Sequence, residues 1–134
     1  LKGTFIPAAE VPSLIDELPA LAGAATQALG ETRVEGAGEL RLKESDRIAA
    51  LGAGLGAMGA RIAATADGFV VRGPVSLHGA VVDSAGDHRI AMALAMAGTL
   101  AAEGESLVSG AECIAVSLPE FEALLRAACV GEGL

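Results

Sequence analysis

The chain has 134 residues, of which 52% are hydrophobic, and a formal net charge of −8. This length allows one domain with a sizeable core, and an acidic chain without a basic cluster is unsuited to binding nucleic acid or acidic membranes. Phenylalanine, present three times, is the only aromatic residue, so the predicted core consists of Ala, Leu, Val and Ile.

The first third of the chain predicts a strand, a loop and a helix. The strand spans residues 1–6, where apolar residues alternate weakly, and prolines over residues 7–13 predict the loop. Acidic residues and a proline over residues 16–19 are typical of a first helical turn. We expect this helix to continue to Leu29 and to end at Gly30.

The middle third predicts a strand, a helix and a hairpin. Residues 31–35 form the expected strand, and Ser45 or Glu44 is expected to cap a helix that runs to about Met58. An Asp-Gly turn between two apolar runs predicts a β-hairpin over residues 61–72.

The last third predicts a similar alternation. One or two strands are expected within residues 75–82, Asp87 is expected to cap a helix that runs to about Ala102, and residues 105–109 predict a further strand. Residues 117–120 have the pattern of a capping box, which predicts the start of a final helix.

An internal repeat predicts the fold class. Residues 30–34 and 104–108 are similar, and each follows an Ala-rich helix and leads through a glycine to another helix. We therefore predict two βαβαββ-type units, over about residues 1–72 and 73–134, in one partial α/β (α+β) domain. The helix over residues 90–97 has no polar face. Such helices are buried on several sides, so the sheets are expected to face outward.

Two arginines occupy similar places at predicted helix starts. Arg47 and Arg89 each lie one or two residues after an acid and are followed by Ile-Ala. A first helical turn carries free N–H groups and the positive end of the helix dipole, and a guanidinium adds a planar donor for phosphate or carboxylate. The pattern predicts two anion sites for a small ligand. The alternative is a surface ion pair between each arginine and its neighbouring acid, Asp46 or Asp87.

Three other charged residues could take part in chemistry. Lys43 could stabilise negative charge or move a proton, and Glu44 and Asp16 could exchange protons. Each also has a structural interpretation. Lys43 could simply be solvated, Glu44 could be an acid favoured by the helix dipole, and Asp16 could be a helix cap.

Other features argue against a metal, a disulfide or a membrane span. Cys113 and Cys129 lack a Cys-x-x-Cys spacing and fit a reducing cytoplasm, and the two histidines have no partner at ligand spacing. The longest apolar run, residues 90–100, is shorter than the ~20 residues that cross a bilayer. We also expect the chain to be part of a longer protein, because it begins at Leu1 without a methionine.

Four stretches resemble the C-terminal part of one enzyme family. They are Pro12–Pro19, Lys43–Arg47, Asp87–Met92 and Ser117–Phe121, and they occur in the family's order across almost the whole chain. The family is EPSP synthase, also called 3-phosphoshikimate 1-carboxyvinyltransferase, which is one of the enolpyruvyl transferases. Four motifs in order are far more specific than one.

The resemblance implies a reaction and a fold. Family members transfer the enolpyruvyl (carboxyvinyl) group of phosphoenolpyruvate to the 5-hydroxyl of shikimate 3-phosphate and release phosphate. This step of chorismate and aromatic amino-acid biosynthesis uses no metal or organic cofactor. Each family domain contains three units with helices inside and sheets outside, an inside-out α/β arrangement. The resemblance covers the last two units of one domain.

The resemblance also implies roles for individual residues. Arg47 and Arg89 are implied to bind phosphoenolpyruvate, and Lys43 is implied to contact shikimate 3-phosphate and the reacting oxygens. Asp16 is implied to take the proton from the 5-hydroxyl, and Glu44 is implied to be the second group for proton transfer.

Two further positions bear on the resemblance. His88 is implied to hydrogen-bond the phosphate of phosphoenolpyruvate. Val116 stands where many members have a lysine, although a branch with Ala-x-Ser-Phe-Pro lacks it too. The family's Lys-Ser phosphate-binding segment and a further arginine lie in an N-terminal part outside this sequence. We therefore expect the chain to need that part as a partner and to be inactive alone.

Two other functions remain open. A related transferase that acts on UDP-N-acetylglucosamine is disfavoured by the Lys-Glu-Ser-Asp-Arg string, and a non-catalytic anion-binding module of the same fold is the non-enzyme alternative. The catalytic interpretation predicts that Asp16, Lys43, Arg47 and Arg89 converge on one cleft. It also predicts that Val116 is directed toward this cleft or its rim.

Overall fold

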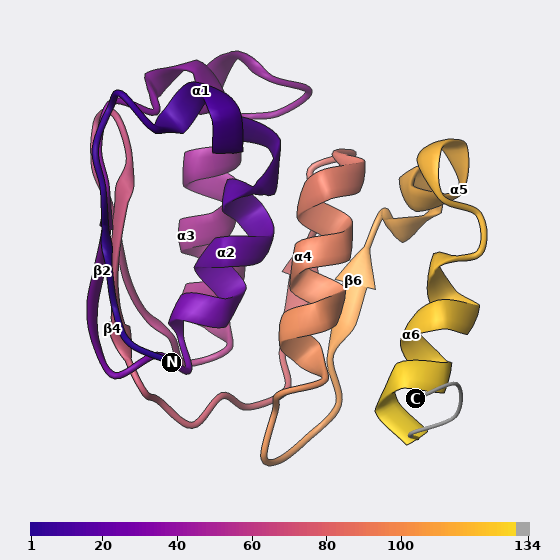
Figure 1. Ribbon diagram of the computed structural model, residues 1–134. Coiled ribbons are helices and arrows are strands. Elements are labelled where there is room, and N and C mark those ends of the chain that lie inside the picture. The colour runs from indigo at the N-terminus through magenta and orange to yellow at the C-terminus, as the bar shows by residue number, and fades with distance from the viewer. Residues whose placement is uncertain (131–134) are drawn as a thin grey trace.

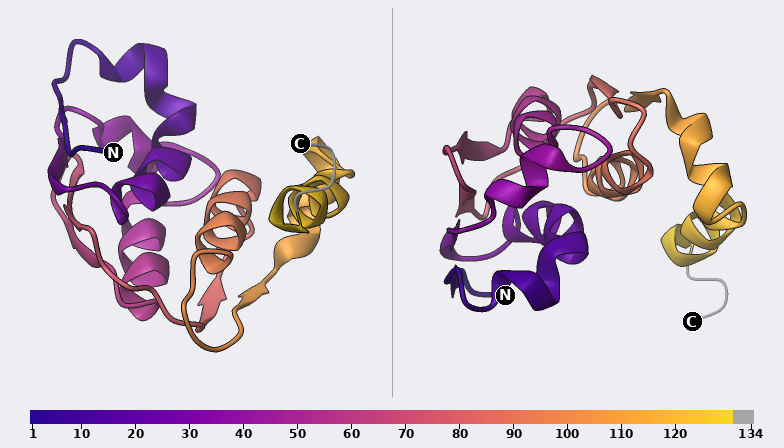
Figure 2. Two further views of the ribbon diagram at one scale, coloured as in Figure 1. Left: turned by 60° about the horizontal axis from the view of Figure 1, so that its bottom comes forward. Right: turned by 90° about the horizontal axis from the view of Figure 1, so that it is seen from above.

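The computed structural model describes residues 1–130 and has helices at its centre with strands on the outside (Figure 1). The central helices are α2 (Leu18–Ala25), α3 (Arg47–Ala57) and α4 (His88–Gly98). Viewed from above, the strands lie at the periphery (Figure 2). This arrangement confirms the predicted α/β class with buried helices and outward-facing sheets.

A four-stranded sheet covers one side of α2 and α3 (Figure 1). Its order is β1 (Phe5–Ile6), β2 (Gly30–Val34), β4 (Phe69–Gly73) and β3 (Arg61–Ala64). β1 and β2 are parallel, and the other neighbours are antiparallel. The predicted hairpin is confirmed, and the Thr65 amide closes its turn by donating to the Gly68 carbonyl at 2.9 Å. Up to residue 73 the order is the predicted βαβαββ.

The segment before α2 differs from the prediction. Residues expected to form a loop contain the short helix α1 (Val11–Leu14), and a 3-10 turn, η1 (Ile15–Glu17), follows it. α2 ends at Ala25, well before the predicted position. The Thr26 hydroxyl donates to the Gly23 carbonyl at 2.7 Å, and such a bond competes with continuation of the helix.

The second part of the chain has fewer strands than predicted. β5 (Val81–Asp83) and β6 (Leu107–Ser109) form a parallel two-stranded sheet that packs against α3 and α4. A 3-10 turn, η3 (Ala111–Cys113), and the helices α5 (Ile114–Ser117) and α6 (Phe121–Val130) follow. The described residues after 73 therefore have the order βαβαα, in which the short helix α5 precedes the predicted final helix and the hairpin that would complete a βαβαββ unit is not seen.

The predicted capping box at residues 117–120 is also wrong. Ser117 is the last residue of α5, and its hydroxyl donates to the Ile114 carbonyl at 3.4 Å. α6 begins only at Phe121 and stands at the edge of the molecule (Figure 1). Its Leu124 remains 56% exposed, so this helix contributes little to the core.

β5 and β6 carry an apolar pair on their outer face. Val81 and Leu107 are register partners, and they are 71% and 62% exposed. Val82, on the opposite face, is buried. This alternation follows from the period of a strand, in which successive side chains point to opposite faces.

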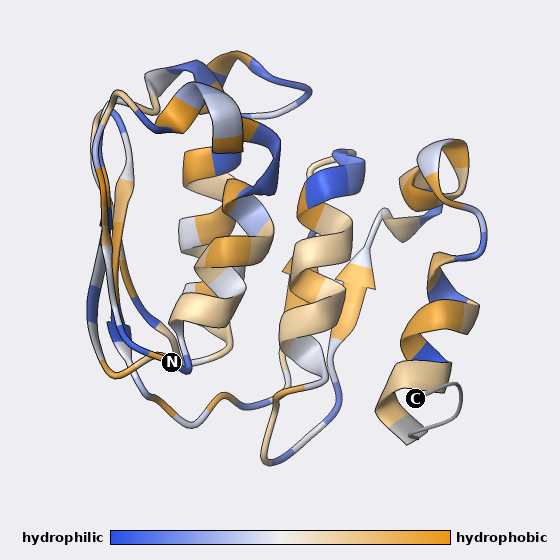
Figure 3. Cartoon of the chain, in the orientation of Figure 1, coloured by the Kyte–Doolittle hydropathy of each residue, from blue (hydrophilic) through white to orange (hydrophobic). Residues whose placement is uncertain are grey.

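The core lies where the three central helices meet. Leu18, Leu51, Leu55, Ile90 and Leu94 are each at most 1% exposed. Burying a side chain of this size stabilises the fold by about 1.5–3 kcal/mol. Figure 3 shows that apolar residues predominate along these helices. No helix among residues 1–130 has the length and apolarity that a bilayer span requires.

All three central helices begin at the same end of the molecule, at the top of Figure 1. α2 follows β1 through α1 and η1, α3 follows β2 through a 3-10 segment, η2 (Gly38–Leu42), and α4 follows β5. Each helix then runs back past its sheet. Figure 3 shows hydrophilic residues gathered at this end, so the polar side chains of three helix starts are brought together.

Candidate anion-binding site

Asp46 caps the first turn of α3. Its carboxylate accepts a hydrogen bond from the Ala49 amide at 3.0 Å, so the predicted caps, Ser45 and Glu44, are wrong. Arg41, in η2, pairs with Asp46 at 2.7 Å. The Ala49 amide and the Arg41 guanidinium both stabilise the charged carboxylate, and they hold the pKa of Asp46 below its ordinary value.

Asp87 caps α4, as predicted, and is completely buried. Its Oδ1 accepts from the Arg89 amide at 3.0 Å and from Arg47 Nη2 at 3.2 Å. Its Oδ2 accepts from Arg47 Nε at 2.8 Å and from the Ser45 hydroxyl at 2.9 Å. Four bonds fill the acceptor capacity of a carboxylate. Burial opposes ionisation, but these bonds outweigh it and lower the pKa of Asp87.

Arg47 is a buried cation with carboxylates on two edges. It is the first residue of α3 and is 1% exposed. Its Nε–Nη2 edge faces Asp87, whereas on its other edge Nη1 lies 3.3 Å from Asp16 Oδ1 and Nη2 lies 2.5 Å from Glu44 Oε2. Burial disfavours the guanidinium charge, but these carboxylates outweigh it and raise the pKa of Arg47.

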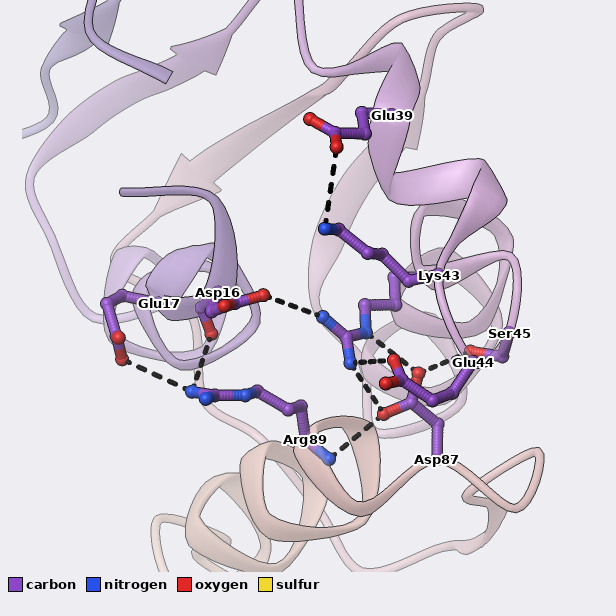
Figure 4. A network of polar contacts seen from close by, with 9 residues as sticks. Asp16, Glu17, Glu39, Lys43, Glu44, Ser45, Asp87 and Arg89 are labelled. Atoms are coloured by element: carbon purple, nitrogen blue, oxygen red, sulfur yellow. Dashed lines mark hydrogen bonds and ion pairs between the residues drawn. The ribbon is translucent and has the colours of Figure 1, made fainter. Parts of the chain in front are cut away.

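Arg89 reaches the same place from α4. Its Nη1 donates to the backbone carbonyl of Asp16 at 3.2 Å and lies 3.7 Å from the Glu17 carboxylate. Asp16 lies within η1 and pairs with Arg47 instead of capping a helix. Asp16 therefore contacts both arginines (Figure 4). The alternative of simple surface pairs with neighbouring acids is wrong, because neither side chain pairs with the acid that precedes it.

Lys43 and Glu44 lie between η2 and α3. Glu44 folds back onto Arg47, and its side chain is 56% exposed. The ammonium of Lys43 points toward Glu39, with the nitrogen 3.6 Å from the carboxylate (Figure 4). Lys43 therefore flanks the arginines, and its side chain remains 25% exposed.

His88 lies next to Arg89, and Val116 lies on the surface of a different helix. His88 is the first residue of α4, beside Arg89, and is half-buried. Val116 lies on α5, which packs against α4, and it is 91% exposed. Burial of Val116 between helices, which would contradict the motif alignment there, is not observed.

Sequence reasoning missed several partners of the arginines. Asp87 was predicted as a cap but not as the ion-pair partner of Arg47. Ser45 was predicted as a cap but not as a donor to Asp87, and Glu17 was not singled out. Asp87 and Arg47 are 40 positions apart, and no spacing rule relates them. The available signal was the shared pattern of an acid and an arginine at the starts of two apolar helices.

This arrangement suits a small anion with carboxylate or phosphate groups. Two guanidiniums stand at helix starts, where free N–H groups and helix dipoles add positive potential. A guanidinium binds either group through two parallel hydrogen bonds. Within residues 1–130, no three His, Cys, Asp or Glu side chains are grouped as metal ligands.

Comparison with known sequences identifies relatives along almost the whole chain. The profile of the family described as EPSP synthase (3-phosphoshikimate 1-carboxyvinyltransferase) matches residues 3–125. The chain is 52% identical over 126 residues to the 3-phosphoshikimate 1-carboxyvinyltransferase of Alkaliphilus oremlandii, and 54% identical over 125 residues to that of Pelotomaculum thermopropionicum. These matches cover 94% and 93% of this chain but 29% of the length of each relative.

Comparison with solved structures identifies the same family as the sequence comparison. The fold is similar to that of an EPSP synthase from Acinetobacter baumannii, with a TM-score of 0.89 and 41% identity over 96% of this chain and 30% of that one. A second structure of an EPSP synthase from the same organism gives a TM-score of 0.86 at 38% identity. From the profile match, the sequence identities and the fold together, the chain belongs to the EPSP synthase (3-phosphoshikimate 1-carboxyvinyltransferase) family.

Proposed function

We propose that this chain forms part of the active site of an enzyme that transfers the enolpyruvyl group of phosphoenolpyruvate to the 5-hydroxyl of shikimate 3-phosphate. The observation that supports this proposal best is the meeting of two arginines at one acid. Arg47 from α3 and Arg89 from α4 both donate hydrogen bonds to Asp16. The reaction needs cations for an anionic substrate beside a base, and this meeting point supplies both.

The proposed roles follow from this geometry and from the family. Arg47 and Arg89 bind the carboxylate and phosphate of phosphoenolpyruvate. Asp16 removes the proton from the 5-hydroxyl, whose oxygen bonds to C2 of phosphoenolpyruvate while Glu44 delivers a proton to the methylene carbon. The tetrahedral intermediate then loses phosphate and a methyl proton, which leaves the enolpyruvyl ether. Proton transfer by positioned groups of this kind contributes about 10²–10⁴-fold to a rate.

Two flanking residues complete the proposal. Lys43, whose ammonium stands beside the network, contacts shikimate 3-phosphate and stabilises negative charge on the reacting oxygens. His88, next to Arg89 at the start of α4, donates a hydrogen bond to the phosphate of phosphoenolpyruvate. Neither role requires a metal or an organic cofactor.

The rest of the site is proposed to come from outside this chain. The chain spans 29% of the length of the relatives named above, and the resemblance assigns further cations to an N-terminal part. We also propose a cytoplasmic enzyme, because Cys113 and Cys129 are free thiols and free thiols persist in a reducing compartment.

The test is a phosphate-release assay on the 134-residue chain mixed with the separately expressed N-terminal part of a family member. Both substrates should yield phosphate, and Arg89→Ala or Asp16→Asn should reduce the rate by about 10²-fold or more. Arg126→Ala is the matched control, because this arginine lies on α6 with a side chain that is 78% exposed. An inactive mixture, or variants as active as the control, would contradict the proposal.

A further inference from the structure

The two edges of the Arg47 guanidinium are held by different kinds of acid. The inner edge, Nε and Nη2, bonds to Asp87, which is completely buried. The outer edge, Nη1 and Nη2, bonds to Asp16 and Glu44, whose side chains are 45% and 56% exposed. One edge is therefore sealed inside the protein, and the other is held by side chains that reach solvent.

We infer that Asp87 is a positioning residue that fixes Arg47 by its inner edge, so that the outer edge serves as an anion seat. Asp16 and Glu44 fill this seat until the carboxylate or phosphate of a ligand displaces them. The inference rests on the proposed function only for the identity of the ligand, phosphoenolpyruvate. The roles of the two guanidinium edges, positioning for the inner edge and binding for the outer edge, are the same for any anion.

Asp87 is suited to positioning because it connects both arginines. It accepts from the side chain of Arg47 and from the backbone amide of Arg89, and so it links the starts of α3 and α4. The Ser45 hydroxyl donates the remaining bond at 2.9 Å. A carboxylate with all four acceptor positions filled cannot rotate without losing a bond, so the direction of the outer edge is set before any ligand arrives.

The contacts on the outer edge are suited to exchange. Two separate acids share this edge, and each is partly exposed, so water competes with both contacts. One ligand carboxylate or phosphate can accept parallel hydrogen bonds from both outer nitrogens, which is the stronger geometry. Displacement also frees the Asp16 carboxylate beside the bound ligand, where the proposed base has to act.

The experiment follows the arginine side-chain NMR signals of the full 134-residue chain during titration with phosphoenolpyruvate. Arg47→Lys assigns the Arg47 signals. Binding should shift the signals of the two outer nitrogens and leave the Nε–H signal nearly unchanged. Glu44→Gln should tighten binding about 3- to 10-fold, because it removes a charge-assisted contact that competes with the ligand. Asp16→Asn should act in the same direction.

Glu17→Gln is the matched control, because it removes one charge next to Asp16 and leaves both outer contacts of Arg47 in place. Glu44→Gln that binds no tighter than Glu17→Gln overturns the inference. A ligand-induced shift at Nε as large as that at the outer nitrogens also overturns it, because the ligand would then displace Asp87. The absence of any shift at Arg47 has the same consequence.

A second pair of variants tests positioning. Ser45→Ala removes one bond to Asp87 and should weaken binding about 3- to 10-fold while moving the Nε–H signal of Arg47. Asp87→Asn should weaken it further. Urea unfolding verifies that each variant is folded under the conditions in which affinity is measured. If Asp87 had a purely structural role, the variants would be less stable but would bind with unchanged affinity. That result would overturn the inference.

Inorganic phosphate distinguishes the inference from the proposed function. If Glu44→Gln binds phosphate at Arg47 more tightly than the Glu17→Gln control, the seat is supported. If phosphoenolpyruvate then binds no better than phosphate, the proposed substrate is contradicted while the seat stands.

Discussion

The buried guanidinium of Arg47 shows how a charge becomes compatible with an apolar core. Removing a charged group from water is costly unless it is paired and hydrogen-bonded. Arg47 is 1% exposed, and three carboxylates satisfy it. Among the described residues, no buried side-chain nitrogen or oxygen lacks a hydrogen-bond partner. The fold can therefore carry this cation without a bound ligand.

Removing the charge of Asp87 should be strongly destabilising. Asp87→Asn leaves Arg47 with a buried neutral amide on its inner edge, and breaking a buried pair typically costs about 3–5 kcal/mol. Urea unfolding at pH 7 measures this loss. Glu103→Gln, at an exposed position, is the control and should change the free energy of unfolding by less than about 0.5 kcal/mol. Equal stabilities of the two variants would show that the pair contributes nothing.

The two capping aspartates also predict the effect of acid. The pKa values of Asp46 and Asp87 are lowered in the folded chain. Their contribution to the free energy of unfolding is therefore complete above about pH 3.9, the ordinary pKa of an aspartate. It is lost as the pH falls through the lower pKa values of the folded chain. We expect the free energy of unfolding to decrease below about pH 4.

Asp46→Asn isolates one of these contributions. The amide oxygen still accepts at the cap but carries no charge, so we expect a loss of about 0.3–1 kcal/mol at pH 7, limited by solvent screening. Thermal unfolding between pH 3 and 7 should show a weaker pH dependence for the variant. A pH dependence identical to that of the unchanged chain would contradict this account.

For individual residues, the sequence predicted which side chains come together but not which contacts hold them in place. Asp16, Arg47 and Arg89 were identified from helix-start chemistry and from family motifs. The pairing of Arg47 with Asp87 depends on how α3 packs against α4, and no local pattern encodes that distance. The cap of α3 was misplaced for a related reason, because Glu44, Ser45 and Asp46 are all capable acceptors and only the backbone conformation selects Asp46.

Between elements, α3 packs tightly against α4 at a glycine. A Cβ built at Gly54 would lie 2.6 Å from Cδ2 of Leu94, a residue that is completely buried. Two residues further along α3, a Cβ at Gly56 would meet no atom within 4 Å. The two glycines thus differ in surroundings while they share one helix.

Alanine at these two positions should have different effects. Gly56→Ala should raise the free energy of unfolding by about 0.5–1 kcal/mol, because alanine favours the helix. Gly54→Ala gains the same preference but overpacks the contact with Leu94, which typically costs about 1–3 kcal/mol. Urea unfolding should place Gly56→Ala clearly above Gly54→Ala. The reverse order would be incompatible with close packing of the two helices.

Local signals predicted some elements and not others. The hairpin over β3 and β4 was predictable because an Asp-Gly turn acts within a few residues. α1 was missed because the prolines near it suggest a loop. The repeat in sequence correctly related the strand–helix–strand parts of the two halves, but it does not extend to their last elements. After β6 the described chain continues into α5 and α6, whereas in the first half a single helix, α3, follows β2 and the β3–β4 hairpin comes next.

For the molecule as a whole, catalysis should require more than this chain. Each missing charge-stabilising donor typically costs about 10²–10³ in rate, and the chain spans 29% of the length of its relatives. The 134-residue chain alone should therefore release no measurable phosphate from the two substrates. Weak binding of phosphoenolpyruvate should persist, since Arg47 and Arg89 remain at their helix starts. Family-like turnover by the chain alone would refute this expectation.

The outer face of β5 and β6 has a consequence for handling the chain in solution. Among residues 1–130 these strands pair only with each other, so each has an edge with unbonded backbone groups that can template pairing with another copy. The exposed pair of Val81 and Leu107 adds apolar surface beside these edges. We expect light scattering to detect concentration-dependent aggregation, which Val81→Lys should reduce and Arg126→Lys should not. Colloidal solubility, more than the strength of the core, would then limit the concentration at which the chain can be studied.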